Sequence, residues 1–267
     1  MIIKIVSISR IKGIDIRDNE ISITLDKNSE ALNEVLHYVD ENTNLAKNTL
    51  DYLAKNLIET DNFYIFAKCY QLLIKNGYEI KLTDECISKV ISYIKNLTQL
   101  TAFYNILKSL NLLNKKYEEI IANKVAFEFE TYYKEIHLRI IGLTDFEYVL
   151  ENFLAENSTN RELIEKAVKL FASRFIKKAI DDIPLWLRRH KHRDAFSYFL
   201  TFINVLEEFG LKNAVKDEIE VLKNELKKYK KRIRRAVKNR IKKEENRNEL
   251  KTLISILEDR SLYKYLL

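Results

Sequence analysis

The chain has 267 residues and a mass of 31.7 kDa, and 46% of its residues are apolar, which is enough to bury the core of one large domain or two smaller ones. Four glycines and one proline are too few for an all-β fold, a P-loop or a Rossmann nucleotide-binding loop. With two cysteines, a net charge of +7 and no apolar run near the ~20 residues of a membrane helix, we expect a cytoplasmic protein without a disulfide framework, an integral membrane association, a metal or a cofactor.

Residues 1–27 are expected to form a small β element, because isoleucine recurs there at alternate positions. Pairing Ile14 with Ile23 and Ile16 with Ile21 around a turn at residues 18–19 predicts a β-hairpin, which residues 2–9 would extend to a three-stranded meander. A sheet of this size is only marginally stable by itself. We therefore expect its apolar face to pack on helices.

From residue 28 onward, apolar residues recur every three or four positions, which predicts a mostly α-helical fold. Helices are expected over residues 29–39, 44–57, 63–76, 83–94, 97–113, 117–141, 144–156, 161–180, 184–190, 193–209 and 211–247, with a further helix within 248–267. The polar tract Asn157–Asn160 predicts a boundary between a helical domain at 28–157 and a second at 158–221 that continues the stack. Residues 222–247 stand apart as a basic amphipathic helix.

The expected architecture is a series of antiparallel helix hairpins, stacked as a bundle or as an irregular α-solenoid. A weak internal echo at an offset of 133 residues is consistent with a helical repeat. The echo relates Phe63, Phe66, Leu73 and Gly77 to Phe196, Phe199, Leu206 and Gly210. Chance similarity between amphipathic aromatic helices explains it equally well, and the residues match no tetratricopeptide, ankyrin or leucine-rich consensus.

Few residues mark the ends of the predicted helices. Gly77, Gly142 and Gly210 each follow a helical tract, so each is expected to end its helix in the left-handed conformation. The single proline, Pro184, fits the first turn of a helix that Asp182 would cap.

Positive charge is concentrated between Lys223 and Arg247, where thirteen Lys or Arg residues stand against three Glu residues. The rest of the chain holds 33 basic and 36 acidic residues, so its balance is −3. The basic character of the protein therefore resides in one segment.

On a helix, the apolar residues of this segment form one seam, at Leu222, Leu226, Tyr229, Ile233 and Val237. The opposite face carries a stripe of six cations, Lys227, Lys231, Arg234, Arg235, Lys238 and Lys242. Like charges four residues apart cost about 0.2–0.5 kcal/mol per pair, so folding alone gains nothing from such a stripe. We therefore expect the stripe to face an anionic partner.

Nucleic acid, either DNA or RNA, is the first candidate partner, because each neutralised phosphate releases condensed counterions. The second is an acidic protein, in which case the chain would be a helical protein–protein interaction scaffold or a subunit of a larger complex. The third is peripheral association with a membrane through the basic amphipathic helix. A merely solvated charged face accounts for the same residues and remains the alternative to all three.

A second basic cluster contains Arg188, Arg189 and Arg193 and lies between Trp186 and Phe196. It would extend the predicted phosphate-binding track, and cations beside aromatic rings can also hold unpaired bases. An exposed connection between two helices with buried aromatic residues explains the cluster more simply.

The sequence favours a binding protein over an enzyme. It contains four histidines, His37, His137, His190 and His192, and none has the spacing of a zinc-binding or catalytic motif. Tyr133 shares a helix face with His137, and such a pair is more often a packing contact than a catalytic one. Carboxylates from distant helices can assemble a site without leaving a motif, but no catalytic or metal-ligating residue is identified.

Overall fold

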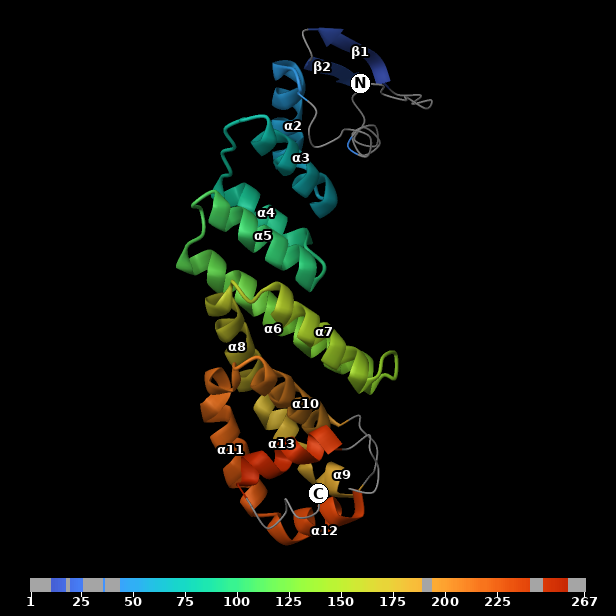
Figure 1. The fold of residues 1–267 in the computed structure, drawn as a ribbon, viewed down its shortest axis with the longest axis vertical. Helices are drawn as coiled ribbons and strands as arrows, with labels where there is room; N and C mark the ends of the chain where they lie inside the picture. Colours follow the sequence, from blue (N-terminus) through green and yellow to red (C-terminus); the bar gives the residue numbers. More distant parts are fainter. Residues whose placement is uncertain are drawn as a thin grey trace. The chain divides into compact units, whose positions relative to one another are not determined.

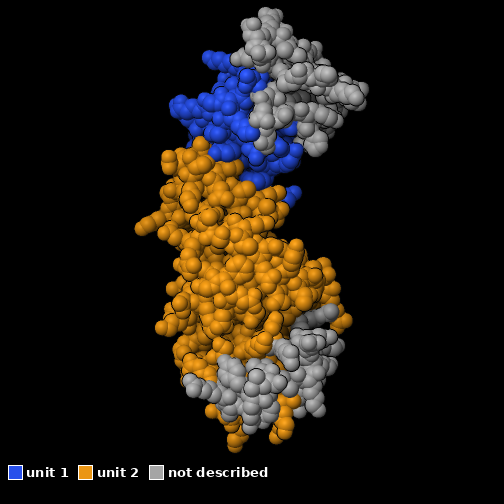
Figure 2. All heavy atoms as spheres, in the orientation of Figure 1, with its two compact units in different colours: residues 1–95 blue, residues 96–267 orange. Residues whose placement is uncertain are grey.

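Most of the chain is helical because its apolar residues recur at helical spacing with few breakers between them. The computed structural model describes residues 11–17, 20–25, 36, 44–188, 194–240 and 247–258. The fold divides into two units, residues 1–95 and residues 96–267, which are coloured separately in Figure 2. The prediction of a mostly α-helical fold with packed helices is confirmed. Within the described ranges, every helix is either too short or too polar to cross a bilayer.

Unit 1 contains a two-stranded sheet and a group of helices (Figure 1). Strands β1 (Ile11–Arg17) and β2 (Glu20–Leu25) pair antiparallel, with Ile14 opposite Ile23 and Ile16 opposite Ile21, the pairs expected from the alternation. Helix α2 (Lys47–Glu59) packs on α3 (Phe63–Lys75), and α4 (Asp84–Tyr93) follows them in the chain. Residues 2–9, the turn at 18–19 and most of the helix expected at 29–39 lie outside the described residues.

Unit 2 is helical throughout its described residues (Figure 1). Its elements are α5 (Leu97–Ser109), α6 (Lys115–His137), α7 (Leu143–Glu156), α8 (Arg161–Asp181), α9 (Ile183–Arg188), α10 (Ala195–Glu208), the 3-10 helix η1 (Lys212–Val215), α11 (Lys216–Lys227), α12 (Lys230–Arg240) and α13 (Arg247–Leu257). Helix α8 packs on both α6 and α10, and α10 also contacts α7 and α13. Helix α10 is therefore central to the unit.

An aromatic cluster fills the core where α6, α7, α8 and α10 meet. Its fully buried members are Phe129, Phe146, Phe171, Tyr198 and Phe202. The ring of Phe171 meets that of Phe129 edge-on, with centroids 5.6 Å apart, and that of Phe202 at 4.7 Å. Edge-to-face pairs of this kind add about 0.5–1.5 kcal/mol each beyond the burial of their area. The Tyr198 hydroxyl donates to the Phe129 carbonyl at 2.5 Å, so its one polar group is satisfied in the core.

The tract at residues 157–160, where the sequence predicts a domain boundary, lies inside unit 2. Its two asparagines are almost fully buried, Asn157 at 1% and Asn160 at 4% exposure. The Asn160 side-chain amide donates to Asn105 Oδ1 of α5 at 3.0 Å. Buried amides need such partners, so the tract joins the α7–α8 connection to α5 and is not a solvated linker.

Two of the three glycines end helices as predicted. Gly77 follows α3 with φ of 69° and Gly210 follows α10 with φ of 68°. The prediction for Gly142 is wrong, because its φ is −91° and it begins α7. The left-handed residue after α6 is Arg139, with φ of 67°. The helix ends there because the Arg139 and Ile140 N–H groups donate back to the carbonyls of Ile136 and Glu135.

The single helix expected over residues 211–247 is not observed. Helix α11 ends at Lys227 in tight turns, in which Lys228 N–H donates to the Glu225 carbonyl and Tyr229 N–H to that of Leu226. Helix α12 then begins at Lys230. The break has a packing reason, since α11 packs on α8 and α13 whereas α12 packs on α9. One straight helix would not reach both surfaces.

Candidate functional site

Helix α12 is held to unit 2 by a narrow apolar seam. Ile233 and Val237 are both fully buried, as are Leu222 and Leu226 on α11, so these members of the predicted seam are correctly placed. Tyr229, between the two helices, is only half-buried. Because residues four apart lie on one face of a helix, Ile233 and Val237 fix which side of α12 faces solvent.

The solvent side of α12 is almost entirely cationic. We call its exposed cations the α12 basic surface: Lys230, Lys231, Arg232, Arg234, Arg235 and Lys238. The helix contains no acidic residue, and its 11 residues span about 16 Å at ~1.5 Å per residue. The stripe predicted from the sequence does not include Lys230 and Arg232, because it assumes one continuous helix with a narrower cationic face.

Within the described residues, carboxylates do not pair with three cations of this surface, Lys231, Arg235 and Lys238. The nearby ion pairs join Lys228 to Glu225 at 2.6 Å and Lys223 to Glu258 at 2.8 Å, and both lysines lie before α12. No ion pair there involves Lys231, Arg235 or Lys238. Their positive charge is therefore available to an external anion.

Two further residues of the predicted basic clusters, Lys227 and Arg188, are described by the structure. Lys227 is exposed at the end of α11 and donates to Asn224 Oδ1 at 2.8 Å, so it belongs to a different helix from the α12 basic surface. Arg188 is exposed at the end of α9, the helix on which α12 packs. The helices that carry the described members of the two predicted clusters, α9 and α12, are therefore in contact. Arg189, Arg193 and Lys242 lie outside the described residues.

The aromatic residues beside the second basic cluster cannot stack bases. Trp186 is 1% exposed, and Phe196, Tyr198 and Phe199 are 0% exposed. The Trp186 ring lies edge-on to Phe196, with centroids 5.3 Å apart. These rings belong to the core, so any contact with a polyanion in this region rests on charge alone.

Two buried carboxylates in unit 2 leave no signal in the sequence. Asp194 and Glu249 are 5% and 6% exposed and come from the start of α10 and of α13. Asp182, predicted to cap α9, instead accepts a hydrogen bond from the Ala195 N–H of α10 at 2.7 Å. Asp182 and Asp194 are 12 residues apart in the chain, and Asp194 and Glu249 are 55 residues apart, so only the fold brings them together.

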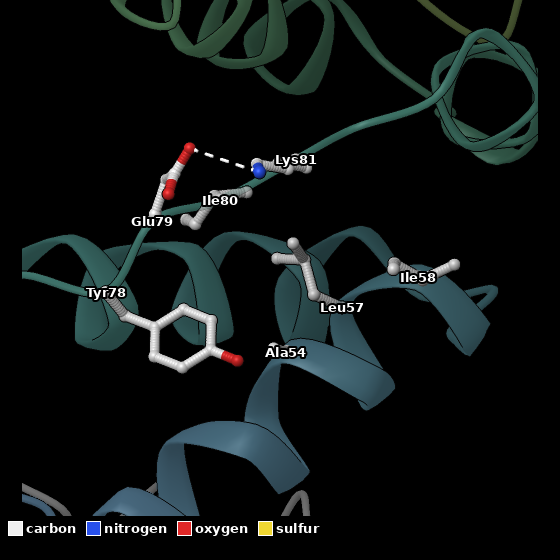
Figure 3. Close-up of a pocket in the computed structure, with 7 residues that line it drawn as sticks. All are labelled: Ala54, Leu57, Ile58, Tyr78, Glu79, Ile80 and Lys81. Atoms are coloured by element: carbon white, nitrogen blue, oxygen red, sulfur yellow. Dashed lines mark ion pairs between the residues drawn. The ribbon is translucent and has the colours of Figure 1, made fainter.

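A pocket of about 450 Å³ lies in unit 1, between α2 and the extended segment Tyr78–Lys81 (Figure 3). Leu57 and Ile80 line it, and the Tyr78 hydroxyl donates to Asp51 at 2.9 Å. Its charged residues, Glu79 and Lys81, pair with each other at 3.4 Å and are both 81% exposed. This arrangement offers no buried acid or base for catalysis.

No other described cluster supports a catalytic or metal centre. Tyr133 and His137 do share a face, with ring centroids 6.0 Å apart, and burial with the nearby Asp182 and Asp194 charges raises the pKa of Tyr133 to about 12. A phenol with that pKa stays protonated near neutral pH, so it does not act as a general base there. Among the described residues, no three His, Cys, Asp or Glu side chains are grouped to hold a metal ion.

Comparison with known proteins adds no identification: the chain matches no protein-family model, no curated protein and no solved structure.

Proposed function

We propose that the protein is a non-enzymatic nucleic-acid-binding protein that contacts phosphates through the α12 basic surface. The observation that carries this proposal is the exposure of six cations on one short helix that contains no acidic residue and is anchored by buried Ile233 and Val237. Crowding these charges costs folding energy. A polyanion recovers that cost, because its phosphates bring negative charge to these cations and release counterions.

The site extends from α12 to the end of α9. Arg188 is the described member of the second cluster, and the packing of α12 on α9 brings its helix beside the basic surface. Arg189 and Arg193 lie outside the described residues, and the proposal assigns them to the same phosphate-binding site. Phosphate contacts position a protein on DNA or RNA without reading its bases. The interface therefore favours binding that depends weakly on sequence.

Charge reversal on α12 tests the proposal. The Lys231→Glu, Arg235→Glu double variant places two negative charges on neighbouring turns of the basic surface. Both side chains are exposed, so the substitutions leave the core unchanged. We expect at least an approximately tenfold loss of affinity for a short DNA or RNA duplex in a gel shift at about 100 mM salt. The melting temperature should stay within about 3 °C of the parent protein, because exposed substitutions cost little.

The matched control reverses two exposed lysines on α8, with Lys169→Glu and Lys177→Glu. It changes the net charge by the same amount in the same unit, so it separates a local surface from the effect of overall charge. Affinity should fall much less than with the α12 variant. Equal losses in both variants, or no duplex binding by the parent protein, would reject the α12 interface. Capture of a protein partner that survives nuclease treatment would favour the scaffold instead.

A further inference from the structure

The start of α13 is joined to the α9–α10 junction through one buried carboxylate. Glu249, in the first turn of α13, is 6% exposed. The indole N–H of Trp186 on α9 and the hydroxyl of Ser197 on α10 both donate to its Oε1 atom, the hydroxyl at 2.8 Å. One carboxylate oxygen thus connects three helices.

A second buried carboxylate lies beside it. Asp194, which caps α10, is 5% exposed, and its Oδ1 accepts the Ser197 N–H at 2.7 Å. Ser197 therefore contacts both carboxylates, one through its backbone and one through its hydroxyl. Two buried carboxylates that share one serine repel each other when both are ionised.

We propose that Asp194 and Glu249 form a proton-dependent latch that fastens α13 to the α9–α10 junction. When Asp194 takes up a proton from solvent, the repulsion between the two carboxylates ends and the hydrogen bonds to Glu249 hold α13 in place. When that proton returns to solvent, two adjacent negative charges lie in the core and α13 is held less firmly. The latch is independent of what α12 binds.

The electrostatic surroundings of Asp194 agree with this device. Burial raises its pKa to about 6 and outweighs the hydrogen bonds from Ser197, which lower it; the charges of Glu249 and Asp182 raise it further. Among the described residues, the charged and titratable groups that face Asp194 are Glu249 from α13, Asp182 from the end of α8, and Tyr133 from α6. The Lys178 ammonium lies over the Tyr133 ring, 4.2 Å from its centroid. Residues 189–193 are outside the described residues.

The sign of the pH dependence follows from the direction of this shift. The pKa of Asp194 is higher in the folded chain than its ordinary value of 3.8, so the folded state binds the proton more tightly. The stabilisation is fully present below about pH 4 and is lost as the pH rises through about 6. Between about pH 5 and pH 7.5 the folding equilibrium should change by about tenfold through this group alone.

Trp186 makes the latch observable, because it is the only tryptophan in the chain and donates to Glu249. The experiment follows Trp186 fluorescence and the urea midpoint of the full-length protein from about pH 7.5 to pH 5. We expect both to titrate near pH 6, with the urea midpoint rising as the pH falls. In Asp194→Asn the amide oxygen can still cap α10, and this transition should disappear.

Controls separate the latch from other titrating groups. Asp217→Asn removes an exposed aspartate from the first turn of α11 and should retain the transition. The His190→Gln, His192→Gln variant should also retain it. Glu249→Gln removes the neighbouring charge and should move the midpoint to lower pH. The proposal is overturned if the parent protein shows no transition, if Asp194→Asn keeps it, or if the histidine variant abolishes it.

Discussion

Arg139 holds a backbone conformation that usually belongs to glycine, with φ of 67°. Its neighbours Leu138 and Ile140 are 67% and 68% exposed, so the end of α6 gains little from packing. Sequence spacing predicts that α6 ends near here, but assigns the left-handed position to Gly142. The helix ends earlier because Asp145 accepts the Gly142 N–H and begins α7. Competition between two nearby helix ends does not show in residue spacing alone.

Glycine substitutions at helix ends should therefore have opposite signs. Arg139→Gly relieves a strained residue and should raise the free energy of unfolding by about 0.5 kcal/mol, after the greater freedom of glycine in the unfolded chain is subtracted. Gly210→Ala should lower the free energy of unfolding by about 1 kcal/mol. Backbone strain at positive φ is the whole cause, because a Cβ at this position meets no atom within 4 Å and so does not clash. Urea denaturation measures both. A loss of stability in Arg139→Gly would contradict this account of α6.

Asp194 should cost stability at neutral pH. A shift from 3.8 to about 6 corresponds to an unfavourable free energy of about 3 kcal/mol when the buried side chain is ionised. Asp194→Asn should therefore raise the free energy of unfolding by about 2 kcal/mol at pH 7.5, because the neutral amide still accepts from Ser197. Near pH 4 the gain should vanish. Equal effects at both pH values in urea denaturation would show that ionisation is not the cause.

At the scale of the element, apolar periodicity locates helices and their buried faces. It places Leu222, Leu226, Ile233 and Val237 inside, and all four are fully buried. Periodicity does not predict the break at Lys228–Tyr229, because the seam continues in phase through it. The break is set by tertiary packing, since α12 meets α9 whereas α11 meets α8. The same limit hides Asp182, Asp194 and Glu249 from sequence analysis.

Ile233 should anchor α12. Ile233→Ala removes a fully buried side chain from a helix with few other apolar contacts, and should lower the free energy of unfolding by about 2–4 kcal/mol. Because α12 carries the basic surface, duplex affinity should fall although no charge changes. Val221→Ala on α11, where the side chain is 52% exposed, is the control and should change both quantities little. Undiminished stability in Ile233→Ala would mean that α12 does not depend on this seam.

At the scale of the molecule, positive charge is concentrated in one segment of the chain, which the net charge of the whole protein does not show. The segment from Lys223 to Arg247 has a balance of +10, whereas the rest of the chain has −3. Folding keeps part of this excess on the surface, because α12 exposes its cations and buries Ile233 and Val237. The sequence predicts that concentration of charge and several of its exposed members. It does not predict that Arg188 lies on the helix against which α12 packs.

The salt dependence of duplex binding tests the central claim most directly. The slope of log affinity against log salt counts phosphate contacts at about 0.9 per contact on a duplex. Neutralising two cations with Lys231→Gln and Arg235→Gln should reduce its magnitude by about 1.8, whereas Lys169→Gln with Lys177→Gln should leave it unchanged. A slope that is the same in the parent protein and the α12 variant would show that phosphates do not contact this surface.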